Sequence, residues 1–253
     1  MAHVTKQVNS QKIKDMNIAL VGYGKMGHEI EEIAVQRGHK ISLIVDIENS
    51  SDLNKEKLAP ADVAIEFSSP GSAFANIIKC LELKIPVVSG TTGWLKDYDK
   101  AVEICRENGT SFIHSSNFSI GVNLLFMLNR ELAHNMTGFP EYNVSIEEIH
   151  HTGKLDAPSG TAIALADGIR GHHPGYRGWC FDTEKLKDFI PVRSVREGSV
   201  PGIHKVTWAS GIDILEIRHE ALNRKGFALG AVVAAEYIRQ HKGVFTMNNV
   251  LGF

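Results

Sequence analysis

The sequence predicts an α/β fold, in which an N-terminal domain built on a parallel sheet is followed by an α+β domain with a mixed sheet. Three observations predict it. Short apolar runs alternate with helical patterns between residues 16 and 114, a glycine-rich turn follows the first apolar run, and several strand-like runs succeed one another after about residue 120. Strands that alternate with single helices form parallel sheets, because each helix returns the chain to the same end of the sheet.

The composition excludes several classes of protein. The 253 residues include 27 basic and 29 acidic side chains, so the net charge of −2 argues against a nucleic-acid partner. The apolar stretches are far shorter than the ~20 residues of a membrane-spanning helix. Three widely spaced cysteines, Cys80, Cys105 and Cys180, have neither disulfide nor zinc spacing. We therefore expect a cytoplasmic protein with no membrane partner, and we read the polar residues 1–15 as a flexible tail.

The elements of the first domain are predicted by short apolar runs and by the helix-start and helix-stop residues between them. Strands are expected at residues 17–21, 40–45, 63–67, 87–89 and 111–114, and helices at 29–36, 69–83 and 95–107. Ser69 and Pro70 are a helix-start signal, and Gly38 is a helix-stop signal. This dinucleotide-binding domain is expected to span residues 16–118, with the C-terminal region 228–253 packing back on it.

The second domain, expected at residues 119–227, has a different pattern of helices and strands. Helical patterns cover 122–134, 159–169 and 227–238, and strand-like runs cover 142–148, 190–195, 203–209 and 213–219. Ser210-Gly211 supplies a hairpin turn between the last two strands. Residues 170–182 show no regular pattern and are expected to be irregular.

The turn Gly22-Tyr23-Gly24-Lys25-Met26-Gly27 has the glycine spacing of a dinucleotide-binding fingerprint. In that Rossmann-like pattern the first glycine permits the tight turn, the second lets the backbone approach a pyrophosphate, and the third allows close packing of helix on strand. The pyrophosphate would lie on the N-terminus of the helix. The alternative is a turn that uses glycine for its geometry alone.

Asp46 lies 24 positions after the first glycine, at the end of the second predicted strand. An acidic side chain at this point accepts hydrogen bonds from the adenosine ribose hydroxyls. Its charge repels a 2′-phosphate, and no arginine follows it, although Lys25 partly offsets the repulsion. The sequence therefore favours NADH over NADPH as the cofactor.

The segment from Glu148 to Thr161 (EIHHTGKLDAPSGT) has the densest chemistry in the chain. Ser159 is a good N-cap for a new helix, so the N–H groups of Gly160 and Thr161 point toward solvent beside Lys154. A helix N-terminus beside a lysine and a histidine is suited to a carboxylate or a phosphate. The same histidines and lysine are also suited to proton transfer.

Other residues carry weaker signals. His150 and His151 are adjacent and would point to opposite faces of an extended chain, so we expect no metal site there. Arg224 lies between the last strand and the last helix, where it could pair with a second carboxylate or be a solvated surface side chain. His204 is interpreted as structural.

These motifs together resemble the 4-hydroxy-tetrahydrodipicolinate reductase (dihydrodipicolinate reductase) family of diaminopimelate and lysine biosynthesis. The resemblance covers residues 16–253. It is carried by Glu148-Ile149-His150-His151, Lys154, Asp156-Ala157-Pro158-Ser159-Gly160-Thr161-Ala162, Gly90-Thr91-Thr92-Gly93, Asn117-Phe118-Ser119, and His219 with Arg224 and Phe227.

The resemblance implies an NAD(P)H-dependent oxidoreductase that acts on a small cyclic imine dicarboxylate, and a homotetramer assembled by the second domain. It implies catalytic roles in proton transfer for His150 and Lys154, and substrate contacts for His151, Gly160, Thr161 and Arg224. It implies cofactor contacts for Gly22, Tyr23, Gly24, Lys25, Met26, Gly27, Asp46, Gly90, Thr91, Thr92, Ser115, Ser116, Asn117 and Phe118. The alternatives are a non-catalytic dinucleotide sensor, another dehydrogenase of amino-acid metabolism, and a nucleic-acid-binding regulator.

Overall fold

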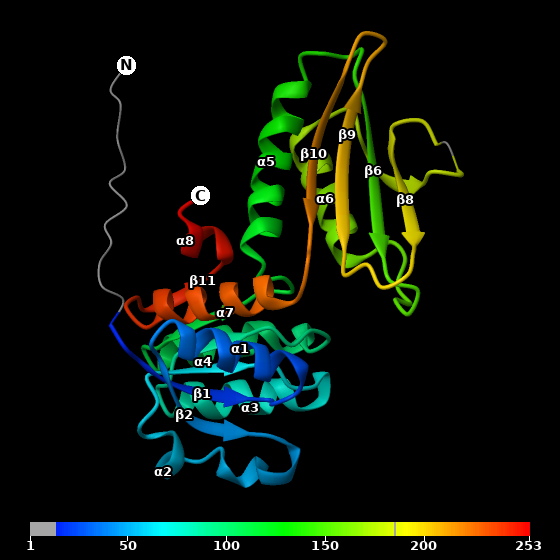
Figure 1. The fold of residues 1–253 in the computed structure, drawn as a ribbon. Coiled ribbons are helices and arrows are strands. Elements are labelled where there is room, and N and C mark those ends of the chain that lie inside the picture. Colours follow the sequence, from blue (N-terminus) through cyan, green and yellow to red (C-terminus); the bar gives the residue numbers. More distant parts are fainter. Residues whose placement is uncertain (1–13, 185) are drawn as a thin grey trace. The chain divides into compact units, whose positions relative to one another are not determined.

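The structure is a computed structural model that describes residues 14–184 and 186–253. It divides into two compact units. Unit 1 contains the described residues up to His114 together with Ala231–Thr246, and unit 2 contains Ser115–Gly230 and Met247–Phe253. Each unit has its own sheet (Figure 1). The tail expected at residues 1–15 lies outside the described residues except for Lys14 and Asp15.

Sheet A of unit 1 is entirely parallel and has six strands in the order β11-β5-β4-β3-β1-β2. They are β1 (Asn17–Val21), β2 (Lys40–Val45), β3 (Val63–Glu66), β4 (Val87–Ser89), β5 (Ser111–His114) and β11 (Gly243–Phe245). The predicted parallel sheet is confirmed. The sequence reading missed β11, a strand of three residues that lies at the end of the chain and pairs with β5.

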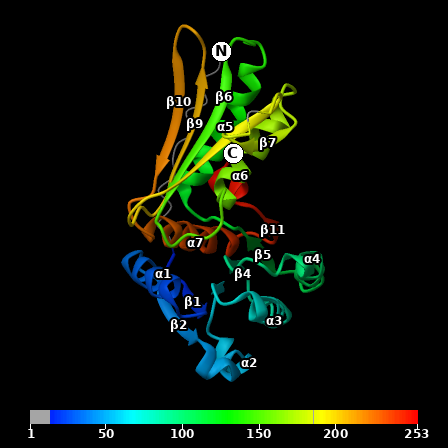
Figure 2. The same cartoon turned by 90° about the vertical axis from the view of Figure 1, so that its right-hand side faces the viewer.

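Helices connect the strands of sheet A. They are α1 (Lys25–Gln36), the 3₁₀ helix η1 (Ile47–Asp52), α2 (Lys55–Leu58), α3 (Pro70–Glu82), the 3₁₀ helix η2 (Leu95–Asp97) and α4 (Tyr98–Glu107). Helix α7 (Lys225–Ile238) precedes β11 in the chain. Helices α3 and α4 contact each other, and α1 lies on the other side of the strands (Figure 2). The predicted arrangement, with helices on both faces of a parallel sheet, is thus confirmed.

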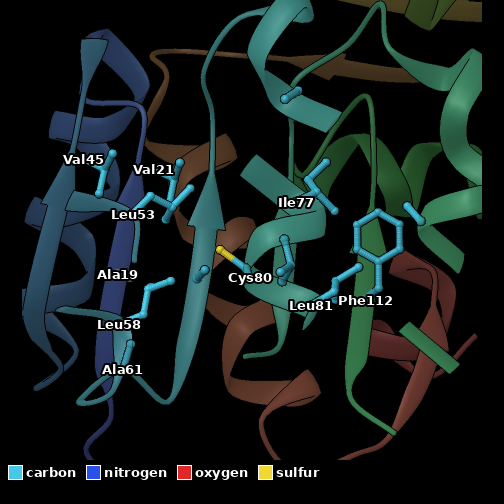
Figure 3. Close-up of a cluster of buried hydrophobic side chains, with 14 of the residues drawn as sticks. Ala19, Val21, Val45, Leu53, Leu58, Ala61, Ile77, Cys80, Leu81 and Phe112 are labelled. Carbon is cyan, nitrogen blue, oxygen red and sulfur yellow. The ribbon is translucent and has the colours of Figure 1, made fainter. Parts of the chain in front are cut away.

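A buried apolar cluster fixes the strands of unit 1 against α3 (Figure 3). Ala19 and Val21 of β1 belong to this cluster with Ile77 of α3 and Phe112 of β5, and each of these side chains is at most 1% exposed. Burying a large apolar side chain stabilises the fold by roughly 1.5–3 kcal/mol. This core holds the carboxyl ends of β1 and β3 in place, where the functional residues of unit 1 begin.

The strand order places a topological switch point between β1 and β3. From β1 the chain goes first to β2 on one side and then to β3 on the other side. The connecting segments therefore diverge at the carboxyl ends of these two strands. Such a crevice is where open α/β sheets bind their ligands, so sheet A predicts the location of a ligand independently of the glycine pattern.

Sheet B of unit 2 has five strands in the order β10-β9-β6-β8-β7. The pairs β10–β9 and β9–β6 are antiparallel, and the pairs β6–β8 and β8–β7 are parallel. The strands are β6 (Asn143–His150), β7 (Gly178–Phe181), β8 (Phe189–Arg196), β9 (Ile203–Ala209) and β10 (Ile214–Glu220). The predicted mixed sheet is confirmed, but the expectation that residues 170–182 are irregular is wrong for 170–172, which are helical, and for β7.

Helices α5 (Ile120–Met136) and α6 (Gly160–His172) contact each other and the strands of sheet B (Figure 1). The remaining helix, α8 (Met247–Leu251), contacts α5. Strand β6 alternates between exposed and buried positions, and Val144 and Ile146 pack in the core with Val206 and Trp208 of β9. The side chains at the buried positions therefore face α5 and α6.

Among the described residues, no helix has the length and apolar character that crossing a membrane requires.

Candidate active site

At one end of sheet B the buried positions change from apolar to polar side chains. Glu148 and His150 of β6 continue the buried phase of Val144 and Ile146. Strand register pairs Glu148 with Ser194 and His204, and pairs His150 with Arg196. We call the side chains of Glu148, His150, Ser194, Arg196 and His204 the polar layer.

Glu148 is the centre of the polar layer and is 0% exposed. Its Oε1 accepts a hydrogen bond of 3.0 Å from Nη2 of Arg196 and one of 3.3 Å from the N–H of Ser159, and its Oε2 contacts Nδ1 of His150. Burial alone would raise the pKa of this carboxyl, but the hydrogen-bonding groups, first among them the His150 ring, outweigh burial and lower the pKa to about 2. Glu148 is therefore a carboxylate at neutral pH.

His150 is enclosed within unit 2, where it is 7% exposed. One side of its ring contacts Glu148, and on the other side a Cβ placed on Gly202 would lie only 3.0 Å from Nε2. The His204 ring lies against it edge to face, with ring centroids 5.0 Å apart. Within unit 2, neighbours thus fix the orientation of the His150 imidazole.

His204, unlike Glu148, is uncharged at neutral pH. Burial, followed by the positive field of His150, lowers the pKa of His204 to about 3. Its Nε2 shares a hydrogen bond of 3.2 Å with the hydroxyl of Ser159. His204 is therefore neutral at physiological pH and links β9 to the start of α6.

Lys154 lies in the 151–157 loop, which follows β6. Its Nζ is 2.7 Å from Oδ1 of Asp156, and this hydrogen bond lowers the pKa of Asp156. The Lys154 side chain is 23% exposed, against 9% for that of His150. Within unit 2 the ammonium group of Lys154 is thus more accessible than the His150 imidazole. His151, at the start of the loop, is half-buried, and its carbonyl accepts the N–H of Lys154 at 3.1 Å.

Helix α6 begins where the sequence predicts it. Ser159 is the N-cap, and its hydroxyl accepts the N–H of Ala162 at 3.2 Å. Gly160 and Thr161 form the first turn, where helix geometry gives the backbone N–H groups no acceptor within the helix. The Asn117 amide donates to the hydroxyl of Thr161 at 3.4 Å. These donors make the start of α6 suitable for an anion.

Arg224 is exposed at the start of α7, where its carbonyl accepts the N–H of Phe227 at 3.0 Å. His219, at the end of β10, packs against Gly121, where an added Cβ would lie 2.9 Å from the ring. Burial lowers the pKa of His219. The contacts of Arg224 do not link it to the polar layer, so its role stays a prediction.

In unit 1 the glycine turn has the geometry of a phosphate-binding loop. Gly22 has a φ of +96°, and a Cβ there would lie 2.1 Å from the carbonyl oxygen of Phe67, so a side chain does not fit. A Cβ on Gly27 would lie 2.6 Å from the carbonyl oxygen of Gly22. Gly24, the N-cap of α1, is exposed and has no atom within 4 Å of an added Cβ. Open space at the helix start fits a pyrophosphate there.

The residues around this turn have defined positions and contacts. Lys25 and Met26 are the first residues of α1, and the Tyr23 hydroxyl donates to Glu31 on the same helix. Asp46 is exposed just after β2, and its carboxylate accepts the N–H of Ile47 at 2.9 Å, which caps η1. The acidic group thus lies at the carboxyl end of the strand beside β1, as the fingerprint requires.

A second buried carboxylate, Glu66 at the end of β3, organises the segment after β4. It is 1% exposed, and it accepts hydrogen bonds of 2.8 Å from the Thr91 hydroxyl and 2.7 Å from the Ser89 hydroxyl. The carbonyl of Thr91 is held in turn by Trp94 at 2.8 Å and His114 at 3.1 Å. This hydrogen bonding leaves little freedom to the turn that carries the predicted residues Gly90, Thr91 and Thr92.

The remaining predicted cofactor residues follow β5 and belong to unit 2. The Ser115 hydroxyl donates to the carbonyl of Asn117 at 2.8 Å, and the Asn117 side chain accepts the N–H of Ser119 at 2.9 Å. Ser116 is exposed, whereas Phe118 is buried. The segment is therefore a closed turn whose Asn117 amide faces Thr161.

Comparison with known proteins decides which family has this arrangement. Residues 16–118 match the family described as dihydrodipicolinate reductase, N-terminus, and residues 121–251 match dihydrodipicolinate reductase, C-terminus. The chain belongs to the dihydrodipicolinate reductase family.

Curated relatives of the dihydrodipicolinate reductase family agree. The chain is 56% identical over 238 residues to a 4-hydroxy-tetrahydrodipicolinate reductase of Christiangramia forsetii, covering 93% of this chain and 98% of the relative. It is 35% identical to the reductase of that name from Methanosarcina barkeri, over 94% of this chain and 90% of the relative.

Solved structures give the same result. A dipicolinate-bound dihydrodipicolinate reductase from Paenisporosarcina sp. TG-14 has a TM-score of 0.76 and 25% identity, with 92% of this chain and 98% of that chain covered. A probable dehydrogenase from Thermotoga maritima, at 11% identity and a TM-score of 0.61 with 93% and 92% covered, shares the fold.

The polar layer of this dihydrodipicolinate reductase family member contains residues that the sequence reading did not single out, namely Glu148 as a functional group and Arg196. The alternation of buried and exposed positions along the two strands indicates both residues. Glu148 lies two positions after Ile146 in β6, and Arg196 lies four positions after Val192 in β8, each in the buried phase of its strand. A charged residue on the buried side of a strand needs a partner of opposite charge, and here that partner lies on the neighbouring strand.

Glu148, His150 and His204 also meet the distance criterion for metal ligands, because one ligand atom from each lies within 4.8 Å of the others. The guanidinium of Arg196 already donates to this carboxylate at 3.0 Å. A cation at this position would therefore be repelled by Arg196. The carboxylate and the imidazole are already in contact with each other.

Proposed function

We propose that this chain catalyses the NAD(P)H-dependent reduction of (4-hydroxy-)tetrahydrodipicolinate, or of its dehydrated form dihydrodipicolinate, to tetrahydrodipicolinate in diaminopimelate and lysine biosynthesis. Family membership supports the reaction. The observation that supports the chemistry is that Glu148 contacts both the His150 ring and the N–H of Ser159 at the start of α6, while Arg196 holds the loop that carries Lys154.

The substrate is a cyclic imine with two carboxylates, so its site needs anion-binding groups and a proton donor. We assign the carboxylates to His151, Arg224 and the first-turn amides of Gly160 and Thr161. The dipicolinate named in the related bound structure is also a small cyclic dicarboxylate. Binding both carboxylates orients the ring and lowers the entropic cost of the reaction.

A nicotinamide bound by these residues would supply a hydride to ring C4 of the conjugated imine. The added electron pair leaves negative charge toward the ring nitrogen or the adjacent carbon, and a proton neutralises it. We assign this proton to Lys154, whose ammonium group is the more accessible, with His150 in support. For the dehydrated, conjugated imine, hydride and proton together add the two hydrogens that give tetrahydrodipicolinate. The 4-hydroxylated form first loses its hydroxyl group and a neighbouring hydrogen as water, which gives that conjugated imine.

The coenzyme is assigned to the crevice at the carboxyl ends of β1 and β3. Gly22, Tyr23, Gly24, Lys25, Met26 and Gly27 would hold the pyrophosphate, and Asp46 the adenosine ribose. Residues 90–92 and 115–118 would lie along the nicotinamide half. The exposed carboxylate of Asp46 favours NADH over NADPH, since it repels a 2′-phosphate.

We extend the proposal to a homotetramer in the cytoplasm. Strand β10, at the edge of sheet B, has exposed apolar side chains at Ile214 (65%) and Leu215 (43%), which suit contact with another copy. The three cysteines are free and buried, in keeping with a reducing compartment. Light scattering coupled to size exclusion tests the tetramer, and a monomer at assay concentration would contradict it.

The test of the reaction is the loss of nicotinamide absorbance with NADH and NADPH in parallel. A coupled synthase supplies the unstable substrate from pyruvate and aspartate semialdehyde. Consumption that depends on the synthase is the expected result. Absence of consumption in a chain that still binds NADH would overturn the proposal in favour of a non-catalytic sensor.

The coenzyme preference has its own test. Replacing Asp46 by Ser and Ile47 by Arg removes the repulsion and adds a partner for the 2′-phosphate. The ratio of kcat/KM for NADPH to that for NADH should rise at least about tenfold. An unchanged ratio would remove Asp46 from coenzyme selection.

A further inference from the structure

The polar layer contains an ion pair to which the proposed function gives no role. Glu148 is fully buried, and the side chain of Arg196 is 20% exposed. Their closest atoms are 3.0 Å apart, and register places the two residues on neighbouring strands, β6 and β8. A pair this deep is costly to desolvate, so its retention calls for a physical reason.

The contacts of this pair supply the reason. Oε2 of Glu148 contacts the His150 ring just before the 151–157 loop, and Oε1 accepts the N–H of Ser159 just after it. Between these points Arg196 donates from Nε to the carbonyl of Lys154 at 3.3 Å and from Nη2 to the carbonyl of Asp156 at 2.6 Å. The ion pair thus holds the beginning, middle and end of one loop.

We propose that Glu148 and Arg196 are positioning residues that hold the Lys154 ammonium group and the His150 imidazole in the geometry for proton transfer. This inference rests on the proposed function, because it assigns those two groups to the reaction. Neither Glu148 nor Arg196 itself contacts substrate in the proposal. They act through the backbone of the loop and through the orientation of the His150 ring.

The chemistry of arginine explains why this residue type is needed. Its planar guanidinium donates several hydrogen bonds in fixed directions at once, which a lysine ammonium group on a flexible stem does not reproduce. In this structure Nη2 joins the Glu148 carboxylate to the carbonyl of Asp156, while Nε reaches the carbonyl of Lys154. Lysine at position 196 keeps the charge and loses this geometry.

The same two strands offer a matched control. Glu147 and Arg193 are paired in register on β6 and β8, with their closest atoms 3.4 Å apart. The Arg193 side chain is 63% exposed, and neither residue belongs to the polar layer. Arg193→Lys therefore makes the same chemical change in an ion pair on the same strands without touching the loop.

The experiment compares Arg196→Lys, Arg196→Ala and Glu148→Gln with Arg193→Lys. We expect Arg196→Lys to lower kcat about 10- to 100-fold, with KM for NADH within about twofold, because misplacement of a reacting group by ~1 Å has an effect of this size. Millimolar guanidinium should restore kcat of Arg196→Ala at least about tenfold and leave Glu148→Gln unrestored. Arg193→Lys should behave as the unchanged chain.

Hydrogen–deuterium exchange gives a readout that does not depend on activity. Arg196→Lys should increase deuterium uptake in the peptide that covers residues 151–158, with uptake in sheet A unchanged. Retention of kcat within about twofold, or normal exchange in that peptide, would overturn the inference. If Arg196→Ala fails to fold, Arg196→Lys decides the outcome.

The two proposals fail in different ways. An unsubstituted chain with no synthase-dependent activity contradicts the proposed function, and the exchange experiment then still decides whether Arg196 holds the loop. An active chain whose Arg196→Lys variant is equally active contradicts only the positioning role.

Discussion

Asn117 donates a hydrogen bond of 3.4 Å from its side-chain amide to the hydroxyl of Thr161. Asn117 belongs to the turn after β5 that is assigned to the nicotinamide, and Thr161 belongs to the first turn of α6, which is assigned to a substrate carboxylate. The contact therefore links two predicted groups that are 44 positions apart in the sequence. It places donors for both ligands within one unit.

Thr161→Val should weaken substrate binding. The Thr161 hydroxyl accepts the Asn117 amide beside the first-turn N–H groups, and we assign it a hydrogen bond to the same carboxylate. The substitution keeps the shape of the side chain and removes this donor. Such a bond contributes about 1.5–3 kcal/mol, which predicts a rise in KM for the imine of about 10- to 100-fold. Steady-state kinetics with the coupled synthase measure it, with the exposed Thr137→Val as control. An unchanged KM would remove the Thr161 hydroxyl from the substrate site.

Lys154→Ala should lower kcat much more than it weakens coenzyme binding. Removal of a proton donor reduces a rate by about 10²–10⁴-fold. Fluorescence titration should give a Kd for NADH within about twofold of the unchanged chain, since Lys154 is not among the residues assigned to the coenzyme. Lys187→Ala, at an exposed position, is the control. A normal kcat for Lys154→Ala would assign the proton to another group.

Gly22→Ala and Gly24→Ala should separate folding from coenzyme binding. An added methyl at Gly22 meets the carbonyl oxygen of Phe67 at 2.1 Å, whereas at Gly24 it meets no atom within 4 Å. Gly22→Ala should therefore lower the thermal midpoint. Gly24→Ala should keep the midpoint and weaken NADH binding, because its methyl enters the space assigned to the pyrophosphate. Tight binding by Gly24→Ala would contradict this assignment.

His204 should make the stability of unit 2 depend on pH. Its pKa is about 3 in the folded chain and near 6.5 when unfolded, so only the unfolded chain takes up this proton between those values. The contribution is complete above pH ~6.5 and is lost as the pH falls toward 3. Urea unfolding at pH 8, 6 and 5 should show a smaller fall for His204→Gln, by up to about 1.4 kcal/mol per pH unit.

The exposed His134→Gln is the matched control for that series, and it should follow the unchanged chain. Parallel curves for His204→Gln and the unchanged chain would mean that His204 is already protonated when folded. The Glu148 pKa of about 2 acts at lower pH: its stabilisation is present above ~4.3 and is lost as the pH falls toward 2.

Strands β1 to β5 of sheet A were predictable because local signals agree there. Runs such as 17–21 and 40–45 are apolar and are followed by glycine or aspartate, and their observed bounds coincide with the predicted ones. Strand β7 was missed because its four residues follow a segment rich in Gly, His and Pro, and pairing with β8 stabilises it. Pairing between distant segments leaves little trace in local sequence.

The same distinction holds for the candidate site. The N-cap role of Ser159 depends on residues that follow it directly, so the sequence revealed it. Arg196 lies 42 positions after Lys154 and 40 positions after Asp156 in the sequence. Only the register of β6 against β8 brings Arg196 to their loop. The sequence motif gave Glu148 no role of its own, although the alternation of β6 marks it as buried.

The division of the chain has a consequence for its biosynthesis. Strand β11 completes sheet A by pairing with β5, yet it is synthesised only after all of residues 115–230. Until then β5 has an unpaired edge, which is prone to pair with other chains. Nascent chains truncated before residue 243 should therefore aggregate or recruit chaperones, and release should coincide with emergence of the last strand.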